Sequence, residues 1–300
     1  MKALKAYFHL PGLFEFHDLY AAFLPLFREH REFFYDWCDI GSIYGAPADC
    51  LWGGGRVGFG DATPEAAAEL TRKYGVSARL TFSNSLIRAE HLEDRKCNAL
   101  CALFEKNGAV SSGIIISSDL LLDYLRERYP GFYYVSSTTK VLTRFPDLEA
   151  ELNRPEFSFV VPDFRLNNQF DLLDRLTDAQ RKKAEFLCNE CCWIDCPARK
   201  ECYENVSRKN LGEACPDHVC VSPEAAGGYR FSSAMKSPAF IGIRDIQDVY
   251  LPRGFSHFKL EGRSLGSAVV LEFLLYYMTR PEYQLRVLEE IYLDSTLDLF

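Results

Sequence analysis

The sequence predicts an α/β fold, a single (β/α) TIM-like barrel of seven or eight strands. Short β-branched or aromatic runs alternate with amphipathic helix patterns along the chain, as in a parallel sheet. The 300 residues suffice for one barrel, and no Pro/Gly/Ser-rich linker divides them, so we expect one domain over 1–300. An open doubly wound sheet is the alternative. No Gly-x-Gly-x-x-Gly follows a strand, which argues against dinucleotide binding.

The individual elements follow from turn and cap residues. A helix is expected over 15–33, and a first strand over 37–44 ends before Pro47. Thr63 and Gly75 are typical of the beginning and the end of the next helix. The other predicted strands are 79–84, 112–117, 132–137, 157–162, 185–190, 240–243 and 255–262. The other predicted helices are 89–106, 119–128, 147–153, 170–176, 178–183 and 265–278.

The composition indicates a globular protein of the cytoplasm. Hydrophobic residues make up 48% and charged residues 25%, which argues against general disorder. The net charge of -8 makes nucleic-acid binding unfavourable without excluding one basic cleft. No apolar run reaches the roughly 20 residues of a membrane span, and acidic residues follow the N-terminus before a signal-peptide core. We therefore expect no membrane association.

Seven of the 11 cysteines lie in one segment, 188–220, directly after the sixth predicted strand. Such a density of thiols is typical of a zinc site, an iron-sulfur cluster or a set of disulfides. A reducing cytoplasm favours ligands or buried thiols over disulfides. Spacing alone does not choose between zinc and iron-sulfur. The seven are Cys188, Cys191, Cys192, Cys196, Cys202, Cys215 and Cys220, and Cys50 or His218 is a further possible ligand.

The last predicted strand alternates apolar and charged residues. Lys259, Glu261 and Arg263 should share one face, and Phe258 and Leu260 the other. Three charges aimed into a barrel need partners or a ligand, because unpaired buried charges are costly. The other interpretation, a solvated edge strand, fits poorly with the apolar helix that follows.

This strand, read as Lys259-Leu260-Glu261-Gly262-Arg263, resembles the Lys-Ile-Glu-Gly-Arg motif of the collagenase-like peptidase family thirty-two of the unassigned class, U32. The stretch 241–254, Ile-Gly-Ile-Arg-Asp-Ile-Gln-Asp-Val-Tyr-Leu-Pro-Arg-Gly, is similar to the one that precedes that motif. Two departures indicate a divergent member. Asn189 and Glu190 lie where the family often has His-Gly, and Ser264-Leu265 replaces the usual Met-Lys.

The resemblance implies a (β/α) barrel and points to the family's oxygen-independent hydroxylation branch, which acts on quinone precursors or RNA. Members of that branch hold a [4Fe-4S] cluster on cysteines in this part of the barrel. For this chain the implied ligands are Cys191, Cys192, Cys196 and Cys215. The adjacency of the first two matters, because neighbours in an extended strand point in opposite directions.

Active sites of such barrels gather at the C-terminal ends of the strands. Besides Lys259, Glu261 and Arg263, we expect Asn189 and Glu190 there, together with Arg56 on a glycine-rich loop. Such a mixed-charge mouth suits a small polar or anionic substrate. Other polar residues expected at strand ends are Asn84, Ser117, Asp119, Ser136, Thr138, Lys140, Asp163 and Arg165.

The leading hypothesis is therefore an iron-sulfur barrel enzyme in oxygen-independent hydroxylation or a related redox modification of a small molecule or RNA base, with a possible redox partner protein. One alternative is a non-catalytic scaffold stapled by structural zinc. The other is a peptidase. No His-Glu-x-x-His and no Gly-x-Ser-x-Gly marks peptide hydrolysis, so we rank it last.

Overall fold

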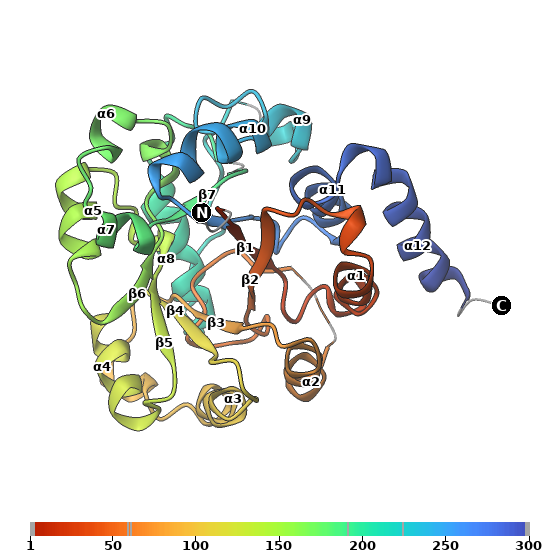
Figure 1. Cartoon of the computed structure of the whole chain (residues 1–300). Coiled ribbons are helices and arrows are strands. Elements are labelled where there is room, and N and C mark those ends of the chain that lie inside the picture. Colours follow the sequence, from red (N-terminus) through yellow and green to blue (C-terminus); the bar gives the residue numbers. More distant parts are fainter. Residues whose placement is uncertain (1–3, 59, 61, 191, 224, 298–300) are drawn as a thin grey trace.

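Eight parallel strands form one sheet that curls into a nearly closed barrel (Figure 1). The computed structural model describes residues 4–58, 60, 62–190, 192–223 and 225–297. The strand order is β6-β5-β4-β3-β2-β1-β8-β7, and a parallel bridge between Val160 and Ala184 brings the two ends of the sheet together. The strands are β1 Ala6–Pro11, β2 Cys38–Gly45, β3 Ala78–Phe82, β4 Gly113–Ile116, β5 Tyr133–Ser136, β6 Phe157–Val160, β7 Glu185–Leu187 and β8 His257–Lys259.

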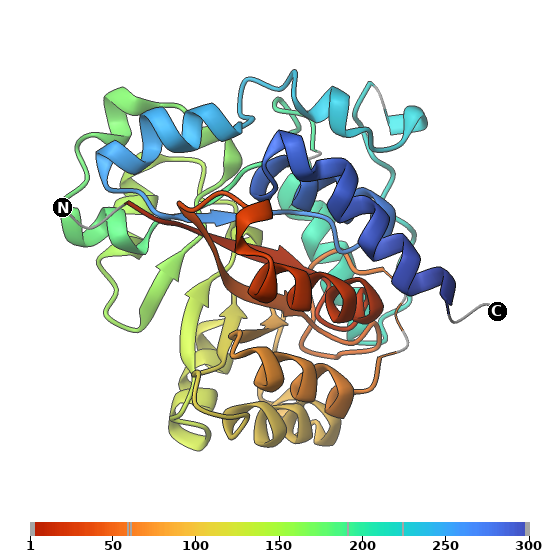
Figure 2. The same ribbon diagram turned by 45° about the vertical axis from the view of Figure 1, so that its right-hand side comes forward.

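Helices cover the outside of the barrel, apart from α8 (Arg199–Asn210), which crosses its mouth (Figures 1 and 2). They are α1 His17–Glu29, α2 Pro64–Tyr74, α3 Arg95–Glu105, α4 Asp119–Arg128, α5 Phe145–Leu152, α6 Phe170–Leu173, α7 Asp178–Lys183, α8 Arg199–Asn210, α9 Phe231–Ala234, α10 Ile243–Asp245, α11 Ser267–Met278 and α12 Gln284–Leu297. The expected TIM-like α/β fold is confirmed.

The side-chain alternation of the strands separates two cores. Phe186 of β7 and Phe258 of β8 point outward into the large core beneath the helices. Their neighbours Leu187 and Lys259 point inward, and the parallel register places these two side by side. A second, smaller core of Tyr44, Ile115, Val135, Val161 and Leu187 lies inside the barrel. The alternation predicted for 258–260 is thus confirmed, since Phe258 and Leu260 belong to the outer core.

Local cap chemistry explains where several helices begin and end. The Thr63 hydroxyl accepts a hydrogen bond from the Ala66 amide, and Gly75 ends α2 with a φ of 63°. Both residues satisfy backbone groups that a helix end leaves without partners. The Ser118 hydroxyl likewise caps α4, whose observed bounds are those predicted.

Two strand predictions were wrong. The first strand is β1, which sequence analysis missed, so the cysteine-rich segment follows the seventh strand and not the sixth. Residues 240–243 form no strand. The Ile241 amide donates to the Cys188 carbonyl just after β7, and a helix begins at Ile243. The segment 240–243 is short and apolar, so its sequence alone does not distinguish it from a buried strand.

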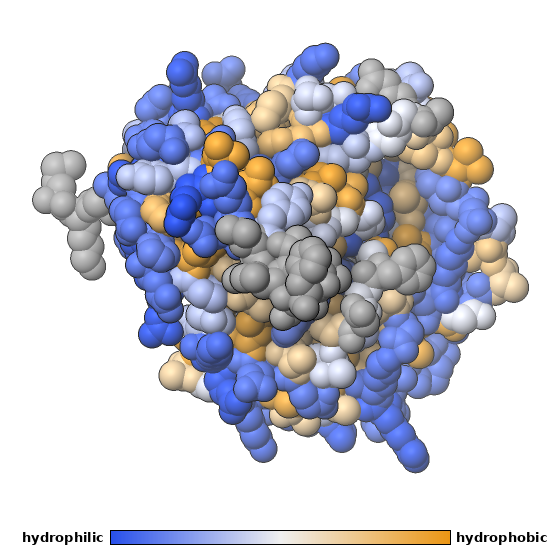
Figure 3. Space-filling model, turned by 90° about the vertical axis from the view of Figure 1, so that its right-hand side faces the viewer, coloured by the Kyte–Doolittle hydropathy of each residue, from blue (hydrophilic) through white to orange (hydrophobic). Residues whose placement is uncertain are grey.

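The outer surface carries mixed polarity. On the face shown in Figure 3, hydrophobic and hydrophilic residues are interspersed. Among the residues that the structure describes, no helix is long and apolar enough to cross a bilayer.

Candidate functional site

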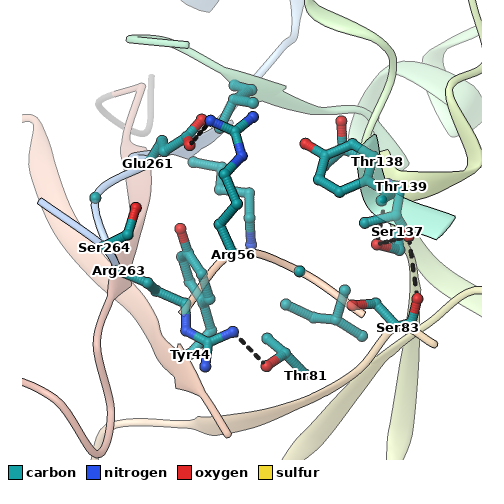
Figure 4. A pocket seen from close by; sticks show the side chains of 16 residues that line it. Tyr44, Arg56, Thr81, Ser83, Ser137, Thr138, Thr139, Glu261, Arg263 and Ser264 are labelled. Carbon is teal, nitrogen blue, oxygen red and sulfur yellow. Dashed lines mark hydrogen bonds and ion pairs between the residues drawn. The ribbon is translucent and has the colours of Figure 1, made fainter. Parts of the chain in front are cut away.

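A pocket opens at the C-terminal mouth of the barrel, where barrel enzymes place their active sites (Figure 4). Its empty volume is about 590 Å³, including the part open to solvent. Arg56 and Glu261 face each other on one side, and Ser137, Thr138 and Thr139 lie on the opposite side. The lining residues are Tyr44, Gly55, Arg56, Thr81, Ser83, Ile115, Ser137, Thr138, Thr139, Leu187, Tyr203, Lys259, Glu261, Gly262, Arg263 and Ser264.

Beneath the pocket the strands carry a buried group of charged and imidazole side chains, His9, Arg79, Glu185, His257 and Lys259, here called the interior cluster. Glu185 Oε2 lies 2.6 Å from Arg79 Nη1 and 3.3 Å from His9 Nε2. His9 Nε2 lies 3.1 Å from His257 Nδ1. Glu185 Oε1 lies 3.7 Å from Lys259 Nζ, which is too long for a hydrogen bond. One carboxylate therefore serves two cations.

This environment lowers the pKa of Lys259 to about 7. Burial is the largest cause, because it disfavours the charged ammonium; Glu185 opposes it, and the positive charges of Arg79 and Arg263 add to it. Burial likewise lowers the pKa of His257 to about 4. Burial opposes ionisation of Glu185 too, but Arg79 and Lys259 outweigh it and hold its pKa below the usual value. The barrel interior thus brings a weakly basic amine to the floor of the pocket.

A second group, Arg56, Glu190, Cys192, Arg199 and Glu261, is here called the rim cluster. Arg56 lies 3.3 Å from Glu261, 3.5 Å from Glu190 and 3.0 Å from the Cys192 sulfur. Arg199 lies 2.5 Å from Glu190, and the Cys192 amide donates to Glu190 at 3.0 Å. The guanidinium of Arg56 therefore joins a pocket-lining carboxylate to a thiol of the cysteine-rich segment.

The two carboxyl groups of the rim cluster differ in acidity. Arg199 and Arg56 hold the pKa of Glu190 well below its usual value, although burial opposes them. Burial raises the pKa of Glu261 to about 8, and the nearby Glu190 charge adds to this effect against Arg56. A pair with separated pKa values is typical of sites where one group carries a proton and the other stays ionised.

Arg263 and Asn189 hold the site together rather than face a ligand. Arg263 donates at 2.8 Å to Glu15, to the Thr81 hydroxyl and to the Ala46 carbonyl. Asn189 exchanges two hydrogen bonds with the backbone of Glu261, of 2.8 and 3.2 Å. These contacts lock the end of β8 to its neighbours and so fix the direction of the residues that follow Lys259.

The glycine-rich loop that carries Arg56 packs tightly against the neighbouring strand end. A Cβ on Gly54 would lie 2.3 Å from the Ser83 carbonyl oxygen, and one on Gly58 would lie 2.4 Å from the Arg263 carbonyl oxygen. Only glycine permits such close backbone approach.

The turn after β5 supplies hydroxyl groups to the pocket. The Ser137 hydroxyl accepts from the Thr139 amide at 3.2 Å, and the Thr139 hydroxyl donates to the Ser83 carbonyl at 3.4 Å. Val141 ends this turn with a φ of 55°, a strained conformation for a β-branched residue. Within the described part of the chain, the buried Thr138 hydroxyl has no hydrogen-bond partner, so it is available to a ligand.

The cysteine-rich segment crosses the mouth of the barrel through α8. Asn84, after β3, donates to the Ser207 carbonyl, and Asn210 donates to the Gly53 carbonyl after β2. Arg199 Nε lies 3.4 Å from Asp163, which follows β6. Helix α8 is therefore tied to three strand ends and contributes Tyr203 to the pocket.

The clustered thiols differ in their surroundings. Cys188 is fully buried in the outer core, and burial raises its pKa well above the usual value. Burial raises the pKa of Cys202. The charges of Arg56 and Arg199 oppose this effect, and those of Cys192 and Cys220 add to it. These five groups therefore lie in one neighbourhood. Cys215 lies beside Asn205 of α8 at 3.7 Å.

The predicted ligand set is only partly placed. Cys191 lies outside the described residues, Cys192 belongs to the rim cluster, and Cys196 and Cys215 are half-buried. No three thiol, imidazole or carboxylate groups of the described residues lie close enough together to hold an ion. Cys50 does not reach this region, because its sulfur lies 3.5 Å from that of Cys97 in the core.

Of the predicted site residues, the structure brings Arg56, Lys259, Glu261 and Arg263 to the pocket lining, with Asn189 and Glu190 adjoining them. Glu185 and Arg79, whose charges act on the pKa of Lys259, were not predicted from the sequence, and neither was His9, which adjoins Glu185. Charged residues inside short apolar strands were the available signal. The hydroxyls of Ser83 and Ser137, which follow strand ends, were also not predicted as site residues.

The eight parallel strands, the helices between them and the pocket at the C-terminal mouth define a TIM-like α/β barrel. The chain is similar to a solved structure described as "The Structure of the U32 Peptidase Mk0906", with a TM-score of 0.55 and 13% sequence identity over 87% of this chain and 94% of that one. At this identity the similarity shows a shared fold. No protein-family model and no curated protein matches the chain.

Proposed function

We propose that this protein is a barrel enzyme that modifies a small polar or anionic molecule, or an RNA base, by oxygen-independent hydroxylation or a related redox reaction with a [4Fe-4S] cluster. One observation carries the proposal. Arg56 contacts both the Cys192 sulfur and Glu261, so a thiol of the cysteine-rich segment adjoins the carboxyl group that lines the pocket. Electrons delivered at these thiols would arrive beside the bound substrate.

Two rim cations lie near the thiols that would bind such a group. Arg56 lies 3.0 Å from the Cys192 sulfur, and Arg56 and Arg199 oppose the burial that raises the pKa of Cys202. Four ligands would come from Cys191, Cys192, Cys196, Cys202, Cys215 and Cys220, since Cys188 is buried in the core. When bound, such a cluster supplies electron transfer at a potential that nearby charge and exposure tune.

The residues of this chain have separate tasks in this proposal. Arg56 and the free hydroxyl of Thr138 orient a polar substrate from opposite sides of the pocket. Glu261 holds a proton near neutral pH, and Glu190 keeps the negative charge that orders Arg56 and Arg199. Helix α8 limits the access of water from above, because it is tied to several strand ends.

Anaerobic purification followed by iron and sulfide analysis tests the proposal. We expect about four iron atoms per chain, consistent with one [4Fe-4S] cluster, and loss of most of that iron in a Cys192→Ser variant. Cys38→Ser is the matched control, because Cys38 is buried in β2 away from the mouth and should leave iron content unchanged. Absence of iron both before and after reconstitution would overturn the proposal.

A structural zinc site is the second candidate. The observation in its favour is that the cysteine-rich segment ties the loops of several strands together, as a structural staple does. One equivalent of tightly bound zinc, with unfolding on chelation, would select this reading. Peptide hydrolysis ranks third; it rests on the name of the similar structure, and cleavage of gelatin by the purified chain would support it.

A further inference from the structure

Lys259 places an uncommitted amine at the floor of the mouth pocket. The residue ends β8, is 5% exposed and lines the cavity. Among the described residues its Nζ has no hydrogen-bond partner, and neither has the Thr138 hydroxyl, which also lines the cavity. Buried polar atoms are nearly always paired. Two unpaired ones in a single pocket indicate groups that a ligand completes.

The surroundings of Lys259 distinguish it from a structural ion pair. Its nearest carboxylate, Glu185, is 3.7 Å away and is already bound to Arg79 at 2.6 Å. Lys140, in contrast, lies 2.5 Å from Glu151 and is a closed pair. The Tyr44 ring lies against the Lys259 amine, with 3.3 Å from Nζ to the ring centroid. The ring favours the ammonium form, and so does Glu185.

Burial and the positive charges of Arg79 and Arg263 act in the opposite direction and prevail, so the amine is largely neutral just above neutral pH. A neutral lysine amine in a shielded pocket is a nucleophile, whereas an exposed lysine is protonated and inert at this pH.

We propose that Lys259 forms an imine with a small aldehyde or 2-oxo acid bound in the mouth pocket. The Nζ lone pair attacks the carbonyl carbon, forming a C–N bond, while one amine proton moves to the carbonyl oxygen. The resulting carbinolamine loses that hydroxyl with the second amine proton as water, which leaves the C=N bond. These reaction steps consume no oxidant or reductant.

The pocket chemistry matches this class of ligand. The pocket is open to solvent, and hydroxyls of Ser83, Ser137 and Thr138 line its wall. These groups donate to carboxylate or hydroxyl oxygens of an oxo acid, while Ile115 and Leu187 cover its carbon chain. This inference goes beyond the proposed redox function and uses no residue of the cysteine-rich segment.

Borohydride trapping tests the imine on the full chain. The protein is incubated with pyruvate, and separately with glyoxylate, at pH 6.5 to 8.5, is reduced with sodium borohydride, and is digested for peptide mass spectrometry. We expect one reduced adduct, on Lys259, with a yield that rises through this pH range. The adduct should disappear in Lys259→Met and persist in Lys140→Met, the control for a half-buried lysine outside the pocket.

Mapping the adduct in the wild-type chain keeps the test valid even where a variant folds poorly. Failure of both probes to label Lys259, or labelling of Lys259 no greater than that of exposed lysines, would overturn the inference. Iron is measured on an untreated portion of the same anaerobic preparation, before and after reconstitution. Iron without an adduct would overturn the imine alone, and an adduct without iron would overturn the redox proposal alone.

Discussion

The interior cluster and the rim cluster contain similar side chains in different settings. The interior residues project from strands β1, β3, β7 and β8, and a single carboxylate, Glu185, serves all its cations. The rim residues come from loops and α8, and each rim arginine has two carboxylates within reach. We infer that the strands fix the electrostatic environment of the pocket floor, whereas the loops supply groups that can exchange partners with a ligand.

Removing the shared carboxylate of each cluster should give the largest difference in stability between the two clusters. Glu185→Gln leaves Arg79 buried without its partner, so we expect it to lower the free energy of unfolding by about 3–5 kcal/mol. Glu190→Gln should lower it by less, about 1–3 kcal/mol, because Arg199 keeps Asp163 and Arg56 keeps Glu261. Urea denaturation of both variants measures this, and an equal or reversed order would contradict it.

The weakly basic Lys259 should make stability depend on pH. Its pKa is about 7 in the folded chain, whereas an unfolded lysine has a pKa of about 10.4. Between these values the unfolded state binds more protons than the folded state, so the free energy of unfolding rises with pH. Below pH 7 both states hold the proton, and the cost of burying the charged amine is present in full. From pH 7 to pH 10 the free energy of unfolding of the wild type should rise by up to about 4 kcal/mol relative to that of Lys259→Met.

The free energies of unfolding of wild type and Lys259→Met, measured in urea across this range, give that difference directly. Lys140→Met is the control, since Lys140 is paired with Glu151 and should show no such gain. A difference that stays constant from pH 7 to pH 10 would contradict the prediction.

A smaller effect should separate the two neighbouring glycines of the Arg56 loop. Gly54→Ala forces a Cβ against the Ser83 carbonyl oxygen and should cost about 1–3 kcal/mol of stability. Gly55→Ala is the matched control, because its Cβ would lie 3.7 Å from the nearest atom, an ordinary contact. Thermal unfolding of both variants measures the effect; similar losses for the two would show that the loop is not fixed by this approach.

The barrel could be predicted because its signals are local. The Ile114-Ile115-Ile116 run indicated a strand buried on both faces, and turn residues marked the helix ends. Strand β1 was missed, since a six-residue run containing His9 and Pro11 resembles an irregular leader. The alternation of 258–263 placed Lys259, Glu261 and Arg263 at the pocket.

The interior cluster could not be predicted, because it depends on which strands become neighbours. Arg79 and Glu185 lie 106 positions apart and meet only when the barrel closes. The same holds for the division of labour among the motif residues. Nothing in the sequence separates Arg263, whose three guanidinium nitrogens each donate a hydrogen bond, from Lys259, whose amine has no hydrogen-bond partner among the described residues.

Titration of Lys259 tests whether the barrel interior presents a weakly basic amine to the mouth pocket. The protein is labelled with lysine carrying 13C at Cε, and the signal that Lys259→Met removes is followed by NMR from pH 5.5 to pH 10. We expect the Cε signal of Lys259 to titrate with a midpoint near pH 7. A midpoint near 10.4, the value of an ordinary exposed lysine, would contradict it.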